Sequence, residues 1–167
     1  MALSDLDDAC QVRLFAADPP LQEVTWKRLA SAMDKLFAQF QREEMVSHWG
    51  FELLGGGSVI LTGWRAATPL SGCRQDRLGR LLLAYEQEGQ LLLNALGMVV
   101  EVRDRSGWSP PRLYQRAQLR ALALSGDLDG QSLWWDLQAD TLGDWRHSGR
   151  KPLVETPLGA RILHNAG

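Results

Sequence analysis

The chain has 167 residues, of which 45% are hydrophobic and 23% are charged. These values are typical of a folded protein with a buried core, and they exclude an intrinsically disordered chain. The 18 basic and 20 acidic residues leave a net charge of −2, so we do not expect a nucleic-acid partner, whose phosphates attract basic proteins. We expect one globular domain over residues 1–167.

The number of cysteines and the N-terminal residues indicate the cellular location of the protein. Cys10 and Cys73 are the two cysteines, too few for a disulfide scaffold in a chain of this size. The opening segment MALSDLDDAC carries acids where a signal peptide carries basic residues. No stretch approaches the roughly 18–20 apolar residues of a spanning helix. We therefore predict a cytoplasmic protein with free thiols and no membrane partner.

Two helices are expected in the first quarter of the chain. Ser4 can cap a short first helix, which Asp18-Pro19-Pro20 would end. The apolar residues of this helix would be Leu6, Cys10, Leu14 and Phe15. The second helix has apolar residues at three- and four-residue steps from Trp26 to Phe40, with charged residues between them. This pattern predicts a helix with one face in the core.

The period then changes to that of strands. The segment HWGFELLGGGSVILTGWR holds two short apolar runs separated by Gly55-Gly56-Gly57-Ser58, which predicts a hairpin. The glycines do not fit a phosphate-binding loop, because neither G-x-x-x-x-G-K-[ST] nor G-x-G-x-x-G is present. A third helix is expected between Ser71 and Gly89, and a strand is expected from Met98 onward.

The last third of the chain is harder to interpret. Leu113 to Leu124 fits a helix by composition, but the following segment ALALSGDLDGQSLWWDL also fits two strands around a turn at Gly126 to Gly130. A short helix is expected from Thr141 to His147, and residues from Lys151 onward are expected to form a tail. We expect a strand at the end of this region and leave its start open.

Together these elements predict an α+β protein. N-terminal helices would precede a mostly antiparallel sheet of about five strands with one inserted helix. The order of elements also suits a curved, helix-wrapped sheet of the NTF2-like type, an analogy that carries no function by itself.

Cys73 is the candidate nucleophile. It would stand at the start of the third helix, a position that lowers the pKa of a thiol, with Arg74 and Arg77 nearby. No histidine or acid is tied to Cys73 by a local motif, so a catalytic base would have to come from elsewhere in the chain. The candidate bases are His48, His147 and His164. The alternative is that Cys73 is a small buried residue that packs the turn before the helix.

Arginine and tryptophan supply the candidate binding residues. Arg74, Arg77 and Arg80 are spaced by three, and arginine binds carboxylates and phosphates through two parallel hydrogen bonds. A second row would consist of Arg112, Arg116 and Arg120 if that segment is helical. Trp134 and Trp135 are adjacent, so in a strand they would point to opposite faces, and an exposed one could anchor a partner.

Metal and cofactor sites have no support from the sequence. The three histidines are widely spaced, and neither C-x-x-C nor H-E-x-x-H occurs. The serine nucleophile motif G-x-S-x-G is also absent. We therefore predict no metal and no cofactor.

Two segments carry a resemblance to other proteins. HWGFELL (His48–Leu54) and SGCRQDRLGRLLLAYE (Ser71–Glu86) resemble segments of small cyanobacterial proteins of unknown function. The resemblance implies a housekeeping or photosynthesis-related setting, and it implies no activity, ligand or site residue.

These observations lead to three hypotheses for function. The first is a non-catalytic binding or assembly protein, which contacts a protein partner through Trp134 or Trp135 and some of Arg74, Arg77 and Arg80. The second is a small-molecule-binding protein with a tryptophan-lined pocket in a curved sheet, formed by Trp64, Trp108 and Trp134. The third is a cysteine-dependent enzyme that uses Cys73.

Overall fold

The computed structural model describes residues 2–89, 92–93, 98–104 and 106–164. Its helices are α1 (Glu23–Arg42), α2 (Gly72–Gly89), α3 (Arg116–Ser125), α4 (Leu142–Ser148) and α5 (Pro157–His164), with short 3-10 turns η1 (Leu3–Asp5), η2 (Gly55–Gly57) and η3 (Leu153–Glu155). Its strands are β1 (Gln11–Asp18), β2 (His48–Leu54), β3 (Val59–Arg65), β4 (Leu92–Leu93), β5 (Met98–Glu101), β6 (Arg103–Asp104), β7 (Gly107–Trp108), β8 (Arg112–Tyr114), β9 (Leu133–Trp135) and β10 (Arg150–Pro152). The predicted α+β class is confirmed.

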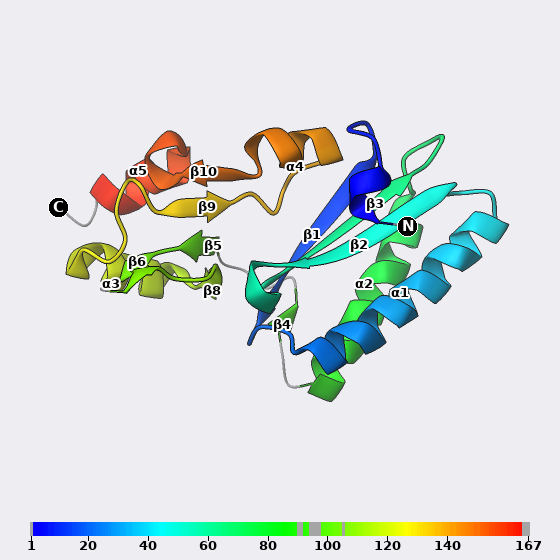
Figure 1. Ribbon diagram of the computed structural model, residues 1–167, viewed down its shortest axis with the longest axis horizontal. Coiled ribbons are helices and arrows are strands. Elements are labelled where there is room, and N and C mark those ends of the chain that lie inside the picture. The colour runs from blue at the N-terminus through cyan, green and yellow to red at the C-terminus, as the bar shows by residue number, and fades with distance from the viewer. Residues whose placement is uncertain (1, 90–91, 94–97, 105, 165–167) are drawn as a thin grey trace.

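The first sheet is built from the first half of the chain. Its strand order is β2-β3-β1-β4, and all of its pairs are antiparallel. The elements follow one another as β1-α1-β2-β3-α2-β4, which together with the strand order is the split β-α-β topology of ferredoxin-like folds. Helices α1 and α2 lie side by side against one face of this sheet (Figure 1). This topology does not define a function.

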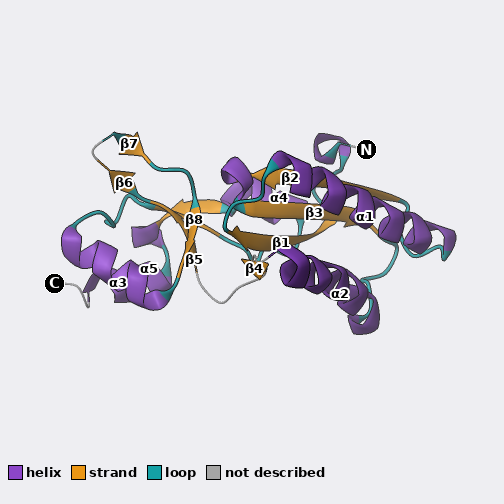
Figure 2. Cartoon of the chain, turned by 90° about the horizontal axis from the view of Figure 1, so that it is seen from below, coloured by secondary structure: helices purple, strands orange, loops and turns teal. Residues whose placement is uncertain are grey.

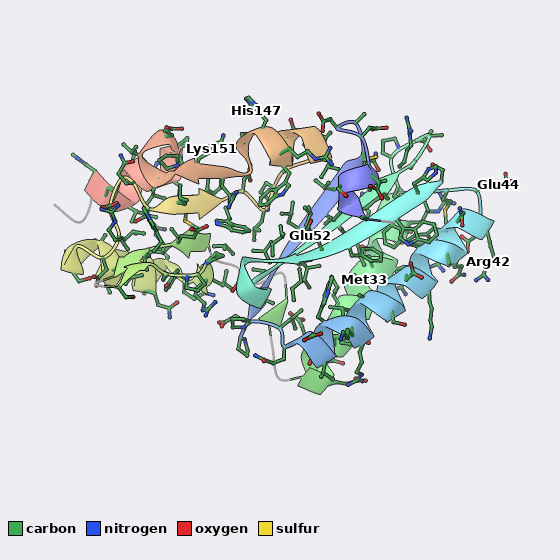
Figure 3. All side chains as sticks on the ribbon, viewed as in Figure 1. Met33, Arg42, Glu44, Glu52, His147 and Lys151 are labelled. Carbon is green, nitrogen blue, oxygen red and sulfur yellow. The ribbon has the colours of Figure 1, made fainter. Side chains whose placement is uncertain are left out.

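The helix-covered face of the first sheet holds an aromatic core. Leu29, Met33, Phe37 and Phe40 follow one stripe of α1 and are fully buried, as their spacing predicted. The Phe37 ring centroid lies 5.4 Å from that of Phe51 and 5.7 Å from that of Trp64. Figure 3 shows Met33 pointing from α1 toward the sheet. The predicted helices at α1 and α2 and the predicted hairpin β2–β3 are therefore confirmed.

The prediction of a first helix from Ser4 to Phe15 is wrong. Beyond the single turn η1, this segment forms β1, the central strand that pairs with β3 from Gln11 to Ala16. Phe15 packs against the helices, whereas Leu14 packs against the second sheet. Where both faces of β1 are covered, from Leu14 to Ala17, apolar residues follow one another without alternation. Such a run cannot be distinguished from a buried helix by periodicity.

A second sheet occupies the other half of the chain. Its strand order is β10-β9-β5-β8, again antiparallel throughout. The strands are therefore divided between two four-stranded sheets, and they do not form one curved sheet. Val99 and Trp135 of this second sheet pack against the first sheet, while Val100 and Trp134 face a cluster that includes α3 and α5 residues. Figures 1 and 2 show α3 and α5 at the opposite end of the molecule from α1 and α2.

The structure resolves the ambiguous last third. Leu113 belongs to β8, and a helix follows in α3, which begins with a capping box between Gln115 and Gln118 and ends at Gly126 with φ 83°. The helix is followed by one strand, β9. The alternative of two strands around a turn at Gly126 to Gly130 is therefore wrong, because the residues before this turn belong to α3. The helix predicted at Thr141–His147 is confirmed as α4, whereas the predicted tail after Lys151 contains the end of β10 and α5.

Candidate functional site

Cys73 is exposed near the start of α2. The backbone N–H groups of Arg74 and Gln75 donate to the carbonyl of Ser71, which closes the first turn. Within the described residues, no histidine or carboxylate hydrogen-bonds to the Cys73 thiol. His147, one of the candidate bases, projects outward from α4 (Figure 3). The expectation that Cys73 is a buried turn residue is wrong, because Cys73 is exposed. The buried cysteine of the chain is Cys10, which is 1% exposed.

The arginines of α2 do not form a uniform row. Arg77 lies with its guanidinium carbon 4.9 Å from the Phe40 ring centroid and forms an ion pair with Glu43 at 3.4 Å. It therefore links α2 to α1. Arg74 and Arg80 are exposed and are the members of this row that a partner can reach.

The second arginine row is divided between two elements. Arg112 belongs to β8, and its Nη1 donates to Ser58 Oγ at 3.1 Å, which connects the second sheet to the first half of the chain. Arg116 and Arg120 are exposed on α3. The spacing of four residues therefore does not place these three arginines on one helix face.

Trp134 and Trp135 point to opposite faces of β9, as predicted, and both faces are covered. Trp135 is 5% exposed, and its indole Nε1 donates to Glu101 at 2.7 Å. Its ring lies 5.7 Å from that of Trp145, and the Arg150 guanidinium stacks on it at 5.4 Å. Trp135 is therefore a residue of the contact between the two sheets. Trp134 is half-buried on the other side.

Trp108 is the one exposed tryptophan of the seven, at 44%. It belongs to the two-stranded pair β6–β7, in which it lies opposite Arg103, and the guanidinium carbon of Arg103 is 5.0 Å from its ring centroid. Figure 2 shows β6–β7 projecting from the body as an extension of β5 and β8. At the base of this hairpin, the N–H of Ser109 donates to the carbonyl of Val102 at 2.9 Å.

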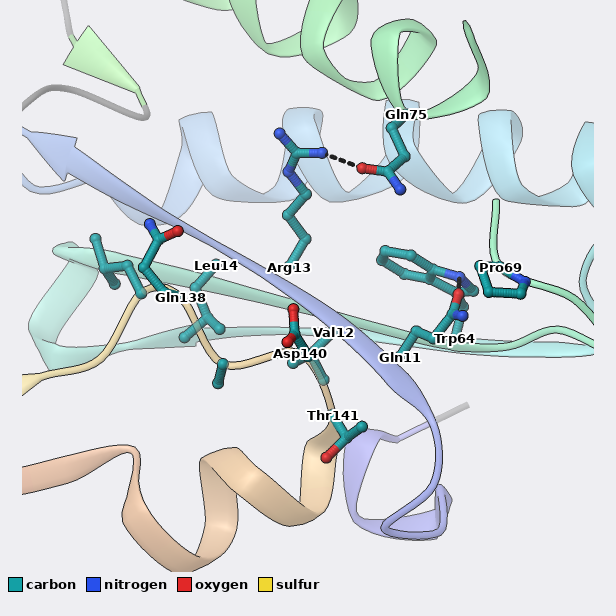
Figure 4. Close-up of a pocket in the computed structure, with 12 residues that line it drawn as sticks. Gln11, Val12, Arg13, Leu14, Trp64, Pro69, Gln75, Gln138, Asp140 and Thr141 are labelled. Atoms are coloured by element: carbon teal, nitrogen blue, oxygen red, sulfur yellow. Dashed lines mark hydrogen bonds between the residues drawn. The ribbon is translucent and has the colours of Figure 1, made fainter. Parts of the chain in front are cut away.

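The three tryptophans expected to line one pocket lie apart. Trp108 is on the hairpin, and Trp134 packs against the cluster beside α3 and α5. Trp64 does line a cavity, which has a volume of about 480 Å³. This cavity lies along β1, between the start of α2 and the segment that precedes α4 (Figure 4). Its polar residues include Arg13, Gln75 and Asp140.

Arg13 and Gln75 are in direct contact at the edge of this cavity. Nη1 of Arg13 donates to Gln75 Oε1 at 2.5 Å (Figure 4). Gln75 Nε2 donates to the carbonyl of Leu70 at 3.1 Å, so the amide is held with its oxygen toward Arg13. The sequence did not identify these residues as a site, because the segment containing Arg13 was predicted to be a helix.

Comparison of the chain with family models, with curated proteins and with solved structures finds no match in any of the three. The resemblance to cyanobacterial proteins therefore stays a prediction. In the described part of the chain, no helix is long and apolar enough to cross a membrane. In that same part, no three His, Cys, Asp or Glu side chains lie close enough together to share a metal ion.

Proposed function

We propose that this protein is a non-catalytic binding or assembly protein, and that the β6–β7 hairpin is its contact element for a protein partner. The observation that carries the proposal is the exposure of Trp108, stacked with Arg103 on a hairpin that projects from the body. Tryptophan and arginine are the residues most enriched at the energetic centres of protein interfaces.

The stacked pair is suited to binding because it is ordered before a partner arrives. The Arg103 guanidinium limits the rotamers of the Trp108 ring, so less side-chain entropy is lost on association. The other tryptophans are buried or half-buried, and their rings stabilise the fold. A partner that buries the Trp108 ring and hydrogen-bonds to the arginine gains both apolar area and charge-assisted hydrogen bonds.

Arg74 and Arg80 provide a second surface that an acidic partner could reach. They lie on α2, whereas Trp108 lies on the hairpin near the other end of the molecule (Figure 2). The surface expected from the sequence combined arginines of α2 with Trp134 or Trp135, of which Trp134 is half-buried and Trp135 is buried. In the present proposal Trp108 and Arg103 replace that tryptophan, on a surface separate from the α2 arginines. The two free cysteines are consistent with a reducing cytoplasm, and we propose that the partner is met there.

Native mass spectrometry of the tagged protein, isolated from the cells that produce it naturally, tests the proposal. We expect a partner at defined stoichiometry with the wild-type protein and its loss from Trp108→Ala and Arg103→Ala. Leu124→Ala is the matched control, because Leu124 is an apolar side chain that is 66% exposed on α3. Loss of the partner from an Arg74→Ala/Arg80→Ala variant, with Trp108→Ala unaffected, would move the contact to α2 and overturn the assignment to the hairpin.

A further inference from the structure

Arg13 is a cation that has no anionic partner among the residues the structure describes. It lies on the central strand β1, is half-buried, and forms no ion pair with any residue that the structure describes. Its contacts are the neutral Gln75 amide and the Phe15 ring, whose centroid is 5.8 Å from the guanidinium carbon. An arginine side chain stays charged at every physiological pH. A partly buried charge that lacks a counter-ion is destabilising, and a bound anion would remove that cost.

Gln75 determines which part of the guanidinium is available. It accepts from Nη1 alone, so the remaining N–H donors of the guanidinium can bind another group. Arg13 and Gln75 also line a second, more open hollow of about 540 Å³ beside α2. Arg13 therefore lines two hollows and is accessible to a small molecule.

The same cavity is lined by Asp140, a carboxylate residue with no cationic partner in the described part of the chain. The carbonyl of Asp140 accepts from the N–H of Val12 at 3.1 Å, which fixes this backbone beside β1. The Asp140 side chain is exposed, lines the cavity, and forms no ion pair within the described residues. The walls of the cavity are partly apolar, with Leu14, Trp64 and Leu137 among the lining residues.

We propose that this cavity binds a small zwitterion of the amino-acid class, with the ligand carboxylate on Arg13 and the ligand ammonium group on Asp140. The cavity volume of about 480 Å³ is in the range of small-molecule sites. Guanidinium and carboxylate match in geometry and form charge-assisted hydrogen bonds. Phosphate is disfavoured because its additional negative charge would enter a cavity that already holds the Asp140 carboxylate. The apolar walls favour a ligand with an uncharged side chain.

A thermal-shift screen of the twenty common amino acids at millimolar concentration, followed by calorimetry on those that bind, tests the proposal. Leucine serves as the example of an amino acid with an uncharged, apolar side chain. Leucine binds, and leucinamide, which lacks the carboxylate, and N-acetyl-leucine, which lacks the ammonium group, each bind about tenfold or more weakly, because each loses one charged contact. Binding of inorganic phosphate in preference to any amino acid, or no binding in the screen, would overturn the proposal.

Variants identify the site. Arg13→Gln should reduce leucine binding about tenfold or more, and Asp140→Asn should remove most of the difference between leucine and N-acetyl-leucine. Arg80→Gln is the matched control, because Arg80 lines the neighbouring hollow and not this cavity. If Arg13→Gln does not fold, Gln75→Leu keeps the guanidinium and removes the acceptor that positions it, so it should still weaken binding several-fold. Binding that is equal in all of these variants would place the ligand elsewhere and refute the proposal.

The site is independent of the contact element proposed above. Trp108→Ala should leave amino-acid binding unchanged, and Arg13→Gln should leave the hairpin intact. Failure of one proposal therefore does not affect the other.

Discussion

The two halves of the molecule differ in the elements that bury their apolar side chains. The first half has helices of 20 and 18 residues, three strands of 7 or 8 residues and the two-residue strand β4. Its core is one in which Phe37 contacts several other aromatic rings. The second half has strands of 2 to 4 residues. Its core on the side away from the first sheet, the outer cluster, has the buried residues Met98, Val100, Val102, Leu119, Leu128 and Leu153. Among the residues whose exposure the structure describes, six large hydrophobic side chains are exposed, and four of them belong to the second half, namely Trp108, Leu124, Val154 and Leu158.

This difference indicates a division of roles between the halves. The first half can bury a complete face of its sheet with its own helices, so it acts as the scaffold. The second half depends on the first, because Val99, Leu113 and Trp135 are buried against β1 and β3 residues. The second half also carries the projecting hairpin. Substitutions in the two halves test this division through the loss of stability that each one causes.

Phe37→Ala should have the largest effect. The ring is fully buried and contacts Phe40, Phe51 and Trp64, so its removal should lower the free energy of unfolding by about 3–5 kcal/mol. Chemical denaturation measures this loss. Hydrogen exchange should show reduced protection in both halves.

Leu119→Ala is the counterpart in the second half. Leu119 is 1% exposed in the outer cluster, and its truncation should cost about 2–5 kcal/mol. If the first half is the scaffold, hydrogen exchange should increase in α3, β9 and α5 and stay slow in α1. Equal loss of protection in α1 would show that the two halves unfold as one unit.

The glycine turn between β2 and β3 gives a matched pair. Gly57 has φ 102°, and a Cβ there would lie 2.5 Å from the carbonyl oxygen of Leu21, so Gly57→Ala should cost about 3 kcal/mol. Gly56 has φ 65° with no atom near its Cβ position, and Gly56→Ala should cost about 1 kcal/mol. Thermal unfolding of both variants measures the difference. Equal effects would mean that backbone conformation alone, without the contact to Leu21, sets the cost.

The elements that the sequence predicts well are those in which the hydrophobic pattern repeats over many residues. The 20-residue helix α1 shows a buried stripe from Leu29 to Phe40, and the turn between β2 and β3 contains glycines with positive φ. The strands of the second half are too short to show any period, and α3 buries Leu119 while its Ala121 and Leu124 are exposed. The face of α3 that carries Leu119 is buried because α5 packs near it, and α5 is distant from α3 in the sequence.

The candidate site follows the same rule. Trp134 and Trp135 were correctly expected on opposite faces, but the burial of Trp135 results from the first sheet, which packs from far away in sequence. Arg13 was missed because a strand with two covered faces resembles a helix in sequence. Asp140 lines the same cavity, and its backbone is held beside β1 by the hydrogen bond from the N–H of Val12, a pairing that no local pattern indicates.

Trp135→Phe tests the contact between the halves. The change removes the hydrogen bond from the indole to Glu101 at 2.7 Å and part of the buried ring, and it should lower stability by about 1–3 kcal/mol. Trp134→Phe is the control, because Trp134 is only half-buried and should lose less. The result to look for in urea unfolding is a larger loss for Trp135→Phe; the reverse order would assign the contact to the outer cluster.

The Cys10 thiol predicts a small dependence of stability on pH. Burial, with a contribution from the nearby Asp7 carboxylate, raises the pKa of Cys10 above its ordinary value. The folded state therefore holds this proton more tightly than the unfolded state does. The stability contribution is complete below the unfolded pKa of about 8.5 and falls as the pH rises beyond it. In Cys10→Ala this part of the alkaline decline should disappear; an unchanged decline would assign it to other groups.

Cys73→Ser should have the smallest effect on stability, within about 0.5 kcal/mol, because the side chain is exposed and makes no hydrogen bond to any described residue. The same position decides the third hypothesis for function. A thiol reagent should label Cys73 in the folded protein and reach Cys10 only on unfolding, so the two cysteines report separately. If Cys73 reacts no faster than glutathione at neutral pH, its surroundings do not activate it, and a cysteine-dependent enzyme loses its chemical basis. A rate well above that of glutathione would instead mean that the start of α2 together with Arg74 and Arg77 favours the thiolate, and the first half would then carry a reactive site in addition to its role as scaffold.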